Sequence, residues 1–475
     1  MFWEIERVAG NKTAIYESAE HCWVSYSEMV ERVSALEEIL KEDRKLLVML
    51  LCDNSLASLT AYLAALRAGH AVVLVNAATD ISLEQRLLDI YTPEVILATA
   101  AMTDPPVGYR LATSPVPGLT VGLAEKPSNA PIDPATAVLL STSGTTGSPK
   151  LIRLSYRNLQ ANAESIVQYL GIDATETAIT SLPMSYSYGL SVINTHLLAG
   201  ANIVCTNASV VVQEFWDLFT GMRSTSFASV PFGYGMLERL RFSRMDLPSL
   251  RTMTQAGGRL APEKIRLFAD AARQKGARFY VMYGQTEATA RISYVPWERL
   301  VEKVGSVGVA IPGGTLHLEW EGREIIKPES EGEMVYEGPN VMLGYAETRD
   351  CLAKGDELRG RLATGDLGYR DTDGFFYITG RLKRFIKVFG LRLNLEEVEK
   401  MLESALSRQV ACVGKDESLH VVIESGDEAD VSEARRRVAE LYKLHHSVVH
   451  VHRTTDLAVN SSGKKDYTAI WRGLK

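Results

Sequence analysis

The chain has 475 residues, more than one hydrophobic core usually supports, so we expect two or more domains. Hydrophobic residues make up 46% and charged residues 23% of the sequence, as in folded, water-soluble proteins. The net charge is −7 at pH 7 and both signs are dispersed, which disfavours nucleic acid as a partner and favours an enzyme acting on small molecules.

The five cysteines are scattered singly and form no CxxC pair, so we expect free thiols in a reducing compartment. The opening residues, MFWEIERVAGNK, carry Glu4, Glu6 and Arg7 where a signal peptide needs an apolar core. The best apolar stretch, TAYLAALRAGHAVVLV, is interrupted by Arg67, short of the roughly 18 apolar residues that a membrane span requires. These features predict a cytoplasmic protein without a membrane span.

The first strong structural pattern is a strand, a helix and a second strand. Residues 45–55, KLLVMLLCDNS, form an apolar run closed by turn residues, as in a buried strand. Leucines then recur at helical spacing from Leu56 to Leu66, and Gly69 ends the helix. Residues 70–76, HAVVLVN, predict another buried strand. This order favours a parallel α/β sheet.

Three further regions extend this organisation. Strand-like runs at residues 201–207 and 277–284, with helical stretches between them, predict that the parallel architecture continues. Residues 103–135 contain seven of the 17 prolines, and a segment so poor in backbone donors is expected to be a surface connection. From residue 303 to 380, short strands alternate with glycine turns, which predicts an antiparallel, barrel-like part.

The residues after 380 are predicted to form a compact α+β tail. Asn394 is placed as the N-cap of a helix, with Glu397 three residues later, as in a capping box. A strand at 420–425, a helix around 434–444 and a strand at 448–452 follow.

The overall prediction is therefore an α/β protein in two domains. The large N-terminal domain, residues 1–380, combines doubly wound parallel sheets with the small barrel-like part. A boundary at residues 381–384 separates it from a small α+β domain at 385–475.

A loop of small and hydroxyl residues, TSGTTGSPK, occupies residues 142–150 directly after an apolar run. Its glycines let the backbone approach a ligand, its amides and hydroxyls offer donors to an anion, and Lys150 adds a positive charge. Taken alone, the loop fits either a phosphate cradle or a solvated turn. It is not a Walker A loop, because G-x-x-x-x-G-K-[S/T] does not occur in the chain.

Eight segments, spread over more than 300 residues, resemble the signature segments of the adenylate-forming superfamily and follow its order. That superfamily includes acyl-CoA synthetases, peptide-synthetase adenylation domains and luciferases. The segments are TSGTTGSPK (142–150), SLPMSYSYGL (181–190), QAGGRL (255–260), MYGQTEAT (282–289), GEMVYEGPNVMLGY (332–345), ATGDLGY (363–369), GRLKRFIKVFGLRLNLEEVE (380–399) and NSSGKKDY (460–467).

The resemblance implies an AMP-forming acid–thiol ligase that works in two halves. A carboxylate first attacks the α-phosphorus of ATP, which releases pyrophosphate and leaves an acyl-adenylate. A thiol then attacks the activated carbonyl carbon. The implied substrates and cofactors are a carboxylic acid, ATP, Mg²⁺, and CoA or the phosphopantetheine arm of a carrier protein.

The resemblance also implies which residues bind the nucleotide and the metal. Glu287 matches the Mg²⁺ ligand, with Thr142 as a second candidate, and Thr286 would contact the α-phosphate. Asp366 and Arg381 match the residues that hold the ribose. The remaining nucleotide contacts implied are Ser143, Gly144, Thr145, Thr146, Lys150, Gly257, Gly258, Tyr283, Gly284 and Gln285.

The C-terminal domain would act as a mobile part, by the same resemblance. Lys464 matches a catalytic lysine that this domain carries to the reacting carboxylate and α-phosphate, although the adjacent Lys465 is an alternative. Lys383 matches the hinge residue, and rotation about it would bring Lys387 and Gly390 to the thiol step.

The acyl pocket is implied at Tyr186, Ser187 and Gly189. Ser187 stands where amino-acid-activating members carry an aspartate for the substrate ammonium, so an α-amino acid is disfavoured. Arg291 has two interpretations: contact with a polar or anionic group of the acyl chain, or pairing with a surface acid, which we expect.

The leading hypothesis is an acyl-CoA synthetase. One alternative loads a carrier protein, or another nucleophile, after the same first step. A catalytically inactive nucleotide-binding regulatory protein is disfavoured by the retained acidic and basic site residues. A phosphotransferase is disfavoured because Walker A and kinase signatures are missing.

Overall fold

The computed structural model describes residues 1–8, 10–79, 81–99, 105–141, 150–388, 391–415, 418–442, 446–460 and 464–474. Among them, the contacts divide the chain into two compact units. The first unit comprises residues up to 141, 150–316 and 336–362, and the second comprises 317–335 and the residues from 363 onward.

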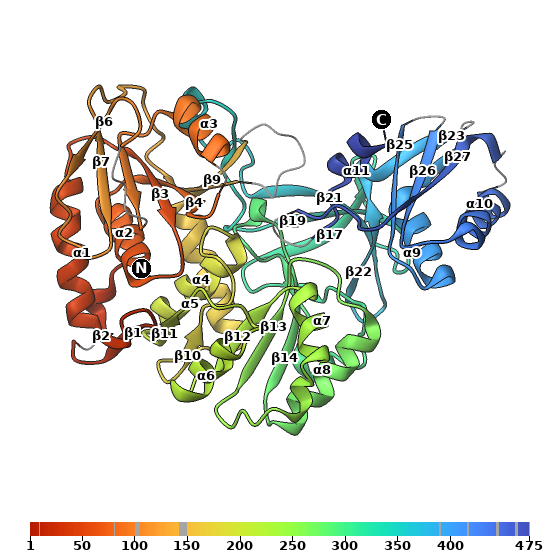
Figure 1. The fold of residues 1–475 in the computed structure, drawn as a ribbon, viewed down its shortest axis with the longest axis horizontal. Coiled ribbons are helices and arrows are strands. Elements are labelled where there is room, and N and C mark those ends of the chain that lie inside the picture. The colour runs from red at the N-terminus through yellow and green to blue at the C-terminus, as the bar shows by residue number, and fades with distance from the viewer. Residues whose placement is uncertain are drawn as a thin grey trace. The chain divides into compact units, whose positions relative to one another are not determined.

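The first large sheet lies in the first unit and has eight strands among the described residues. They are β3 (Leu47–Cys52), β4 (Ala71–Asn76), β5 (Val95–Ala98), β6 (Tyr109–Ala112), β7 (Thr120–Ala124), β8 (Thr136–Ser141), β9 (Leu151–Ser155) and β20 (Gly344–Ala346). Their order is β20-β9-β8-β4-β3-β5-β7-β6, and Figure 1 labels β9, β4, β3, β7 and β6 of this sheet. The central strands β8, β4, β3 and β5 are parallel, and the neighbours on either side are antiparallel.

The second large sheet has nine strands in the same unit. They are β1 (Thr13–Glu17), β2 (Cys22–Ser25), β10 (Thr177–Ile179), β11 (Asn202–Cys205), β12 (Ser226–Ser229), β13 (Thr252–Gln255), β14 (Arg278–Tyr283), β15 (Ser293–Tyr294) and β16 (Val309–Ala310). The order is β16-β15-β14-β13-β12-β10-β11-β1-β2, parallel from β14 to β1 and antiparallel at both ends.

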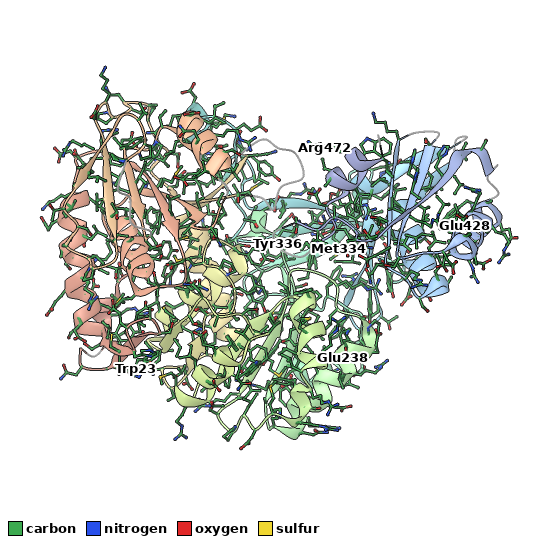
Figure 2. All side chains as sticks on the ribbon, in the orientation of Figure 1. Trp23, Glu238, Met334, Tyr336, Glu428 and Arg472 are labelled. Carbon is green, nitrogen blue, oxygen red and sulfur yellow. The ribbon has the colours of Figure 1, made fainter. Side chains whose placement is uncertain are left out.

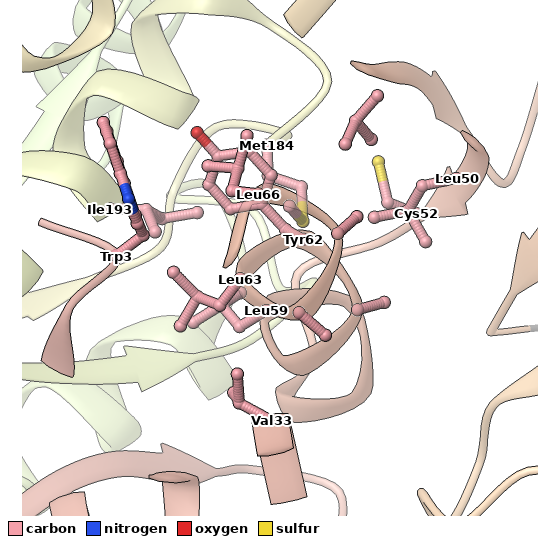
Figure 3. Close-up of a cluster of buried hydrophobic side chains, with 14 of the residues drawn as sticks. Trp3, Val33, Leu50, Cys52, Leu59, Tyr62, Leu63, Leu66, Met184 and Ile193 are labelled. Atoms are coloured by element: carbon pink, nitrogen blue, oxygen red, sulfur yellow. The ribbon is translucent and has the colours of Figure 1, made fainter. Parts of the chain in front are cut away.

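Helices cover these sheets and fill the core between them. They are α1 (Tyr26–Leu40), α2 (Leu56–Arg67), α3 (Ile81–Tyr91), α4 (Tyr156–Leu170), α5 (Ser187–Ala199), α6 (Gln213–Gly221), α7 (Pro231–Arg239) and α8 (Pro262–Gln274). The predicted leucine face of α2 is buried, and its residues pack with Met184 and Ile193 (Figure 3). The same cluster includes side chains of β1, β3, β4 and β11, so it joins both large sheets.

The second unit contains most of a five-stranded sheet in the order β18-β17-β19-β21-β22 and a smaller three-stranded sheet in the order β25-β26-β27. The strands are β17 (Thr315–Trp320), β18 (Arg323–Glu324), β19 (Gly332–Glu337), β21 (Arg361–Arg370), β22 (Phe376–Arg381), β25 (Val410–Lys415), β26 (Ser418–Glu424) and β27 (Val449–Thr454). A hairpin of β23 (Phe385–Val388) and β24 (Leu391–Asn394) and the helices α9 (Leu395–Leu406), α10 (Glu428–Tyr442) and α11 (Tyr467–Gly473) complete it.

These observations confirm the predicted fold class. They also confirm Asn394 as the N-cap of α9, because its Oδ1 accepts hydrogen bonds from the backbone N–H groups of Glu396 (3.0 Å) and Glu397 (3.4 Å). The domain boundary at residues 381–384 stays a prediction.

The expectation for residues 103–135 was wrong, since β6 and β7 lie there and β7 pairs with β5 inside the sheet. The prolines stand before, between and after these two strands, which leaves the backbone donors of the strands themselves intact. All five cysteines are free, and three of them are buried. No helix among the described residues has the length and apolar character needed to cross a bilayer.

His196 gives the first unit a pH-dependent stability. This side chain is buried in α5, and its Nδ1 donates to the carbonyl of Val192 at 2.8 Å, while its Nε2 has no partner among the described residues. Burial lowers the pKa of His196 to about 4. Because its pKa in the unfolded chain is higher, the unfolded state takes up the proton first as the pH falls.

We therefore expect the free energy of unfolding to fall by roughly 3 kcal/mol through this histidine as the pH drops from above 6.5 to about 4. Urea unfolding at several pH values would measure it, with His196→Asn as the comparison because an amide can still donate to Val192. The wild type should lose more stability on acidification than the variant. Parallel pH profiles for the two proteins would contradict the expectation.

Candidate functional site

Tyr345 links Lys150, the last residue of the predicted phosphate loop, to the predicted metal ligand Glu287. Nζ of Lys150 lies 3.5 Å from the centroid of the Tyr345 ring, where a cation is attracted by the aromatic face. The hydroxyl of Tyr345 donates to Oε1 of Glu287 at 3.0 Å. Lys150 also lies 3.7 Å from a carboxylate oxygen of Glu347. The side chain of Tyr345 therefore contacts both the cation of Lys150 and the carboxylate of Glu287, which were predicted separately from the sequence.

The chain places these groups through neighbouring strands. Lys150 directly precedes β9, and Tyr345 lies in β20, which pairs with β9 in antiparallel register. Burial and then the charge of Glu287 raise the pKa of Tyr345, so its hydroxyl remains a donor at neutral pH. Tyr345 was not among the residues predicted from the sequence to form the site. The available signal was the Gly-Tyr pair that ends segment 332–345.

Asn340 holds the segment that carries Glu287. Its Nδ2 donates to the carbonyls of Ala288 at 2.9 Å and Arg291 at 2.8 Å. Its Oδ1 accepts from the hydroxyl of Tyr336 at 2.7 Å, and Tyr336 is labelled in Figure 2. The hydroxyl of Thr289 donates to the carbonyl of Asn340 at 2.6 Å. Thr289 has a φ of 63°, unusual for a threonine, and these bonds stabilise that backbone.

Two other groups lie close to this segment. The hydroxyls of Ser187 and Thr286 are 3.2 Å apart, which joins the start of α5 to the YGxTE segment. Nε2 of Gln285 donates to the hydroxyl of Tyr283 at 3.2 Å, and the Tyr283 ring is buried at the end of β14.

Several predicted glycines are required by close contacts. A Cβ on Gly284 would lie 1.9 Å from the carbonyl oxygen of Ala290. Gly257 has a φ of 84°, and a Cβ there would lie 2.7 Å from the hydroxyl of Tyr186. The predicted acyl-pocket tyrosine and the predicted nucleotide-side glycine are therefore in contact. Two more positions are also crowded: a Cβ on Gly189 would meet the carbonyl of Pro183, and one on Gly258 would lie against the Pro231 ring.

The expectation that Arg291 pairs with a surface acid was wrong. Its side chain is buried, with 2% of the residue exposed. Its guanidinium stacks on the Tyr188 ring at 4.1 Å from the centroid, and NH2 donates to Oγ of Ser191 at 3.3 Å. No acidic residue in the described part of the chain lies within ion-pairing distance of it. The apolar residues on either side draw this segment into the core, which sequence spacing alone did not reveal.

The single carboxylate of Glu287 fits a magnesium ion bound together with a nucleotide. Among the described residues, no group of three or more His, Cys, Asp or Glu side chains is arranged to hold a metal by itself. Mg²⁺ keeps several waters and is commonly bound by one or two carboxylates plus phosphate oxygens. Glu287 is half-buried, and among the described residues its Oε2 accepts no hydrogen bond, so one carboxylate oxygen remains for such a role.

The predicted ribose residues lie together in the second unit. Oδ1 of Asp366 is 2.7 Å from Nε of Arg381, and the two residues are register partners on β21 and β22. The side chain of Asp366 is 2% exposed, whereas that of Arg381 is 59% exposed. The adjacent Gly365 donates its N–H to Oε1 of Glu333 at 3.0 Å.

The structure distinguishes the two lysines near the C-terminus. Nζ of Lys465 donates to Oε1 of Glu403 at 2.6 Å and lies 3.7 Å from Oε2 of Glu399, so this lysine anchors the loop. Lys464 is exposed, and its backbone N–H and C=O both bond to Asn460. The assignment of the catalytic role to Lys464 stays a prediction.

Some predicted residues fall outside the described part of the chain. Those wholly outside it are Thr142, Ser143, Gly144, Thr145, Thr146 and Gly390. The side chains of Lys383 and Lys387 are outside it as well.

The family described as "AMP-binding enzyme" matches residues 2–346 of this chain. The chain is 32% identical over 293 residues to indoleacetate–CoA ligase of Aromatoleum aromaticum, an alignment that covers 61% of this chain and 56% of that protein. It thus spans little more than half the length of this curated relative. It is 29% identical over 413 residues to 2-succinylbenzoate–CoA ligase of Bacillus cereus, covering 85% and 82% of the two proteins.

The fold is similar to that of o-succinylbenzoate CoA synthetase from Bacillus subtilis. The structure of that enzyme with its acyl-adenylate intermediate superposes with a TM-score of 0.77 at 21% identity, covering 99% of this chain and 97% of the other. Its complex with ATP and a magnesium ion gives a TM-score of 0.74 at 20% identity, with 98% of each chain covered.

Proposed function

This chain belongs to the AMP-binding enzyme family, and on that premise we propose that it activates a carboxylic acid with ATP and transfers the acyl group to CoA. The observation that carries the proposal is that Tyr345 contacts both residues: Lys150 lies over its ring, and its hydroxyl donates to Glu287. A reaction between a carboxylate and a triphosphate joins two anions, so its barrier is lowered by a cation and by a held metal ion.

In the first half-reaction, the substrate carboxylate oxygen forms a bond to the α-phosphorus, and the bond from that phosphorus to the bridging oxygen of pyrophosphate breaks. Lys150 would offset negative charge on the β- and γ-phosphates, and Glu287 would hold Mg²⁺ against phosphate oxygens. The Tyr345 hydroxyl keeps the Glu287 carboxylate oriented. Lys464 would add positive charge where the carboxylate meets the α-phosphorus.

In the second half-reaction, a thiolate sulfur attacks the acyl carbon and AMP leaves. The names of the relatives, which are CoA ligases, support CoA as the acceptor over a carrier protein. The buried Ser187 offers no charge for a substrate ammonium, so an α-amino acid remains a poor candidate.

The deciding experiment measures acid-dependent exchange of labelled pyrophosphate into ATP across a panel of carboxylic acids. Exchange with at least one acid supports adenylate formation, and thioester formation with CoA but not with a phosphopantetheinyl carrier supports the acceptor. Release of ADP and phosphate, or no exchange with any acid, would contradict the proposal.

A further inference from the structure

Among the described residues, Arg291 has no carboxylate partner, unlike two other deeply buried arginines. Arg153 lies 2.6 Å from Glu357, and Arg349 lies 2.7 Å from Glu94. Arg291 is as inaccessible as these, yet among the described residues no carboxylate reaches it. Burying a guanidinium without an opposite charge lowers the stability of the fold, so we expect the arginine at this position to serve a purpose other than packing.

The groups around Arg291 satisfy it only in part. NH1 donates to the carbonyl of Ala290 and NH2 to the hydroxyl of Ser191, each at 3.3 Å, which is long for a charged donor. Nε has no hydrogen-bond partner among the described residues, which is also true of the ion-paired Arg153 and Arg349. Arg291 differs from those two because its guanidinium donates to a carbonyl and a hydroxyl, whereas theirs also contact a carboxylate.

The aromatic residues beside Arg291 cannot supply the missing charge. The Tyr188 ring stacks on its guanidinium, and Tyr169 lies close enough for the charge of Arg291 to act on its hydroxyl. Burial raises the pKa of Tyr169 to about 12 and also raises the pKa of Tyr188, although Arg291 acts in the opposite direction on both. The phenols are therefore neutral at physiological pH. They shield the cation from water and leave it without an anion.

This charge lies beside the predicted acyl site. Arg291 stacks on Tyr188, whose ring centroid lies 6.3 Å from that of Tyr186, and a Cβ on Gly257 would collide with the Tyr186 hydroxyl. A small cavity between α4 and α5 is lined by Ser187, by Ser191, which accepts from Arg291, and by Asn194. Ser191 thus connects the guanidinium to a cavity of about 10 Å³ that the predicted acyl-pocket residue Ser187 also lines.

We propose that Arg291 binds a second carboxylate at the distal end of the acyl substrate, so that the substrates of this chain are dicarboxylic acids. The inference rests on the proposed function and narrows its substrate class. One carboxylate reacts with ATP, and the other pairs with the guanidinium that no described residue neutralises. A hydrogen-bonded charge pair of this kind is formed only by the acid that carries the second anion, so it discriminates strongly against a neutral analogue.

The first test compares each dicarboxylic acid with its monomethyl ester, which has nearly the same shape and lacks one charge. With the wild-type protein, kcat/KM for pyrophosphate exchange should be about 30-fold or more higher for one diacid than for its half-ester. Equal or better use of the half-ester across the panel would overturn the assignment. Absence of exchange with every acid, charged or neutral, would instead contradict the proposed function.

The second test uses Arg291→Met, which keeps length but removes the charge. The variant should lose about 30-fold in kcat/KM for the diacid and less than about 3-fold for the half-ester, so that the preference disappears. Arg291→Lys should retain part of it, since a point charge replaces the planar fork. Equal losses on both acids would mean that Arg291 serves only the fold.

Arg349→Met is the matched control, because it removes a buried arginine that has a carboxylate partner in Glu94. It should lower Tm by removing the closer of the two arginines that pair with the buried Glu94, since Arg44 lies farther away at 3.5 Å, without changing the ratio of diacid to half-ester activity. Arg291→Met should lower Tm less, since no described carboxylate loses its partner. A change in the acid ratio with Arg349→Met would show that the ratio reports general damage and would overturn the interpretation.

Discussion

Lys464→Ala should lower the rate of adenylate formation by roughly 1,000-fold, while the reaction of a supplied acyl-adenylate with CoA changes by less than about 3-fold. The reason is that the positive charge is needed only where a carboxylate and an α-phosphate approach each other. Pyrophosphate exchange measures the first half-reaction, and thioester formation from synthetic acyl-adenylate measures the second. Similar losses in both half-reactions would contradict the assignment of Lys464.

Lys465→Ala is the matched comparison at the next residue. It removes the cation beside Glu403 and near the buried Glu399, and we expect a loss of about 2 kcal/mol in the stability of the second unit. Lys464→Ala should leave Tm nearly unchanged, because that side chain is exposed. If instead Lys465→Ala abolished adenylate formation and Lys464→Ala lowered Tm, the roles assigned to the two lysines would have to be exchanged.

Glu287→Gln should lower the rate of adenylate formation by roughly 100-fold at moderate Mg²⁺ concentration, with partial recovery when Mg²⁺ is raised. The amide keeps the size of the side chain and can still accept from Tyr345, so only the negative charge is lost. Titration of pyrophosphate exchange with Mg²⁺ measures the effect. An unchanged Mg²⁺ midpoint would contradict a metal role for this carboxylate.

Tyr345→Phe tests how much the orientation of the Glu287 carboxylate matters when its charge is kept. The phenyl ring still offers a face to Lys150, but the hydroxyl that donates to Glu287 is gone. We expect a smaller effect, about 5-fold on the rate, with nearly normal Mg²⁺ dependence. A shift of the Mg²⁺ midpoint as large as that of Glu287→Gln would mean that the hydroxyl itself serves the metal.

Sequence was sufficient for those features that depend on local pattern. The apolar runs of β3 and β4 and the leucine spacing of α2 predicted a parallel α/β arrangement, because hydrophobic periodicity reflects burial directly. Asn394 was identifiable as an N-cap because capping needs only a short polar side chain before the first turn. The ordered family segments identified the family, which the match to AMP-binding enzymes over residues 2–346 confirms.

Sequence was insufficient wherever the outcome depends on contacts between distant residues. Tyr345 meets Glu287 across 58 positions of the chain, and no local pattern encodes that pair. The burial of Arg291 follows from the packing of neighbouring elements, and polarity alone misleadingly suggested the surface. The strands β6 and β7 were missed because proline content was averaged over the whole segment, although the prolines flank the strands.

The side-chain amide of Asn340 supports both the segment that carries the proposed metal ligand Glu287 and the backbone of Arg291, the proposed acid-binding residue. It fastens the backbone at Ala288, next to the carboxylate of Glu287, and again at Arg291. These two points lie three residues apart, so one amide restrains both ends of this short span. With the roles proposed above, a change that moves Arg291 to suit another acid would also disturb the backbone beside Glu287. New acid preferences should therefore arise from the facing tyrosines of α4 and α5, which are free of that constraint.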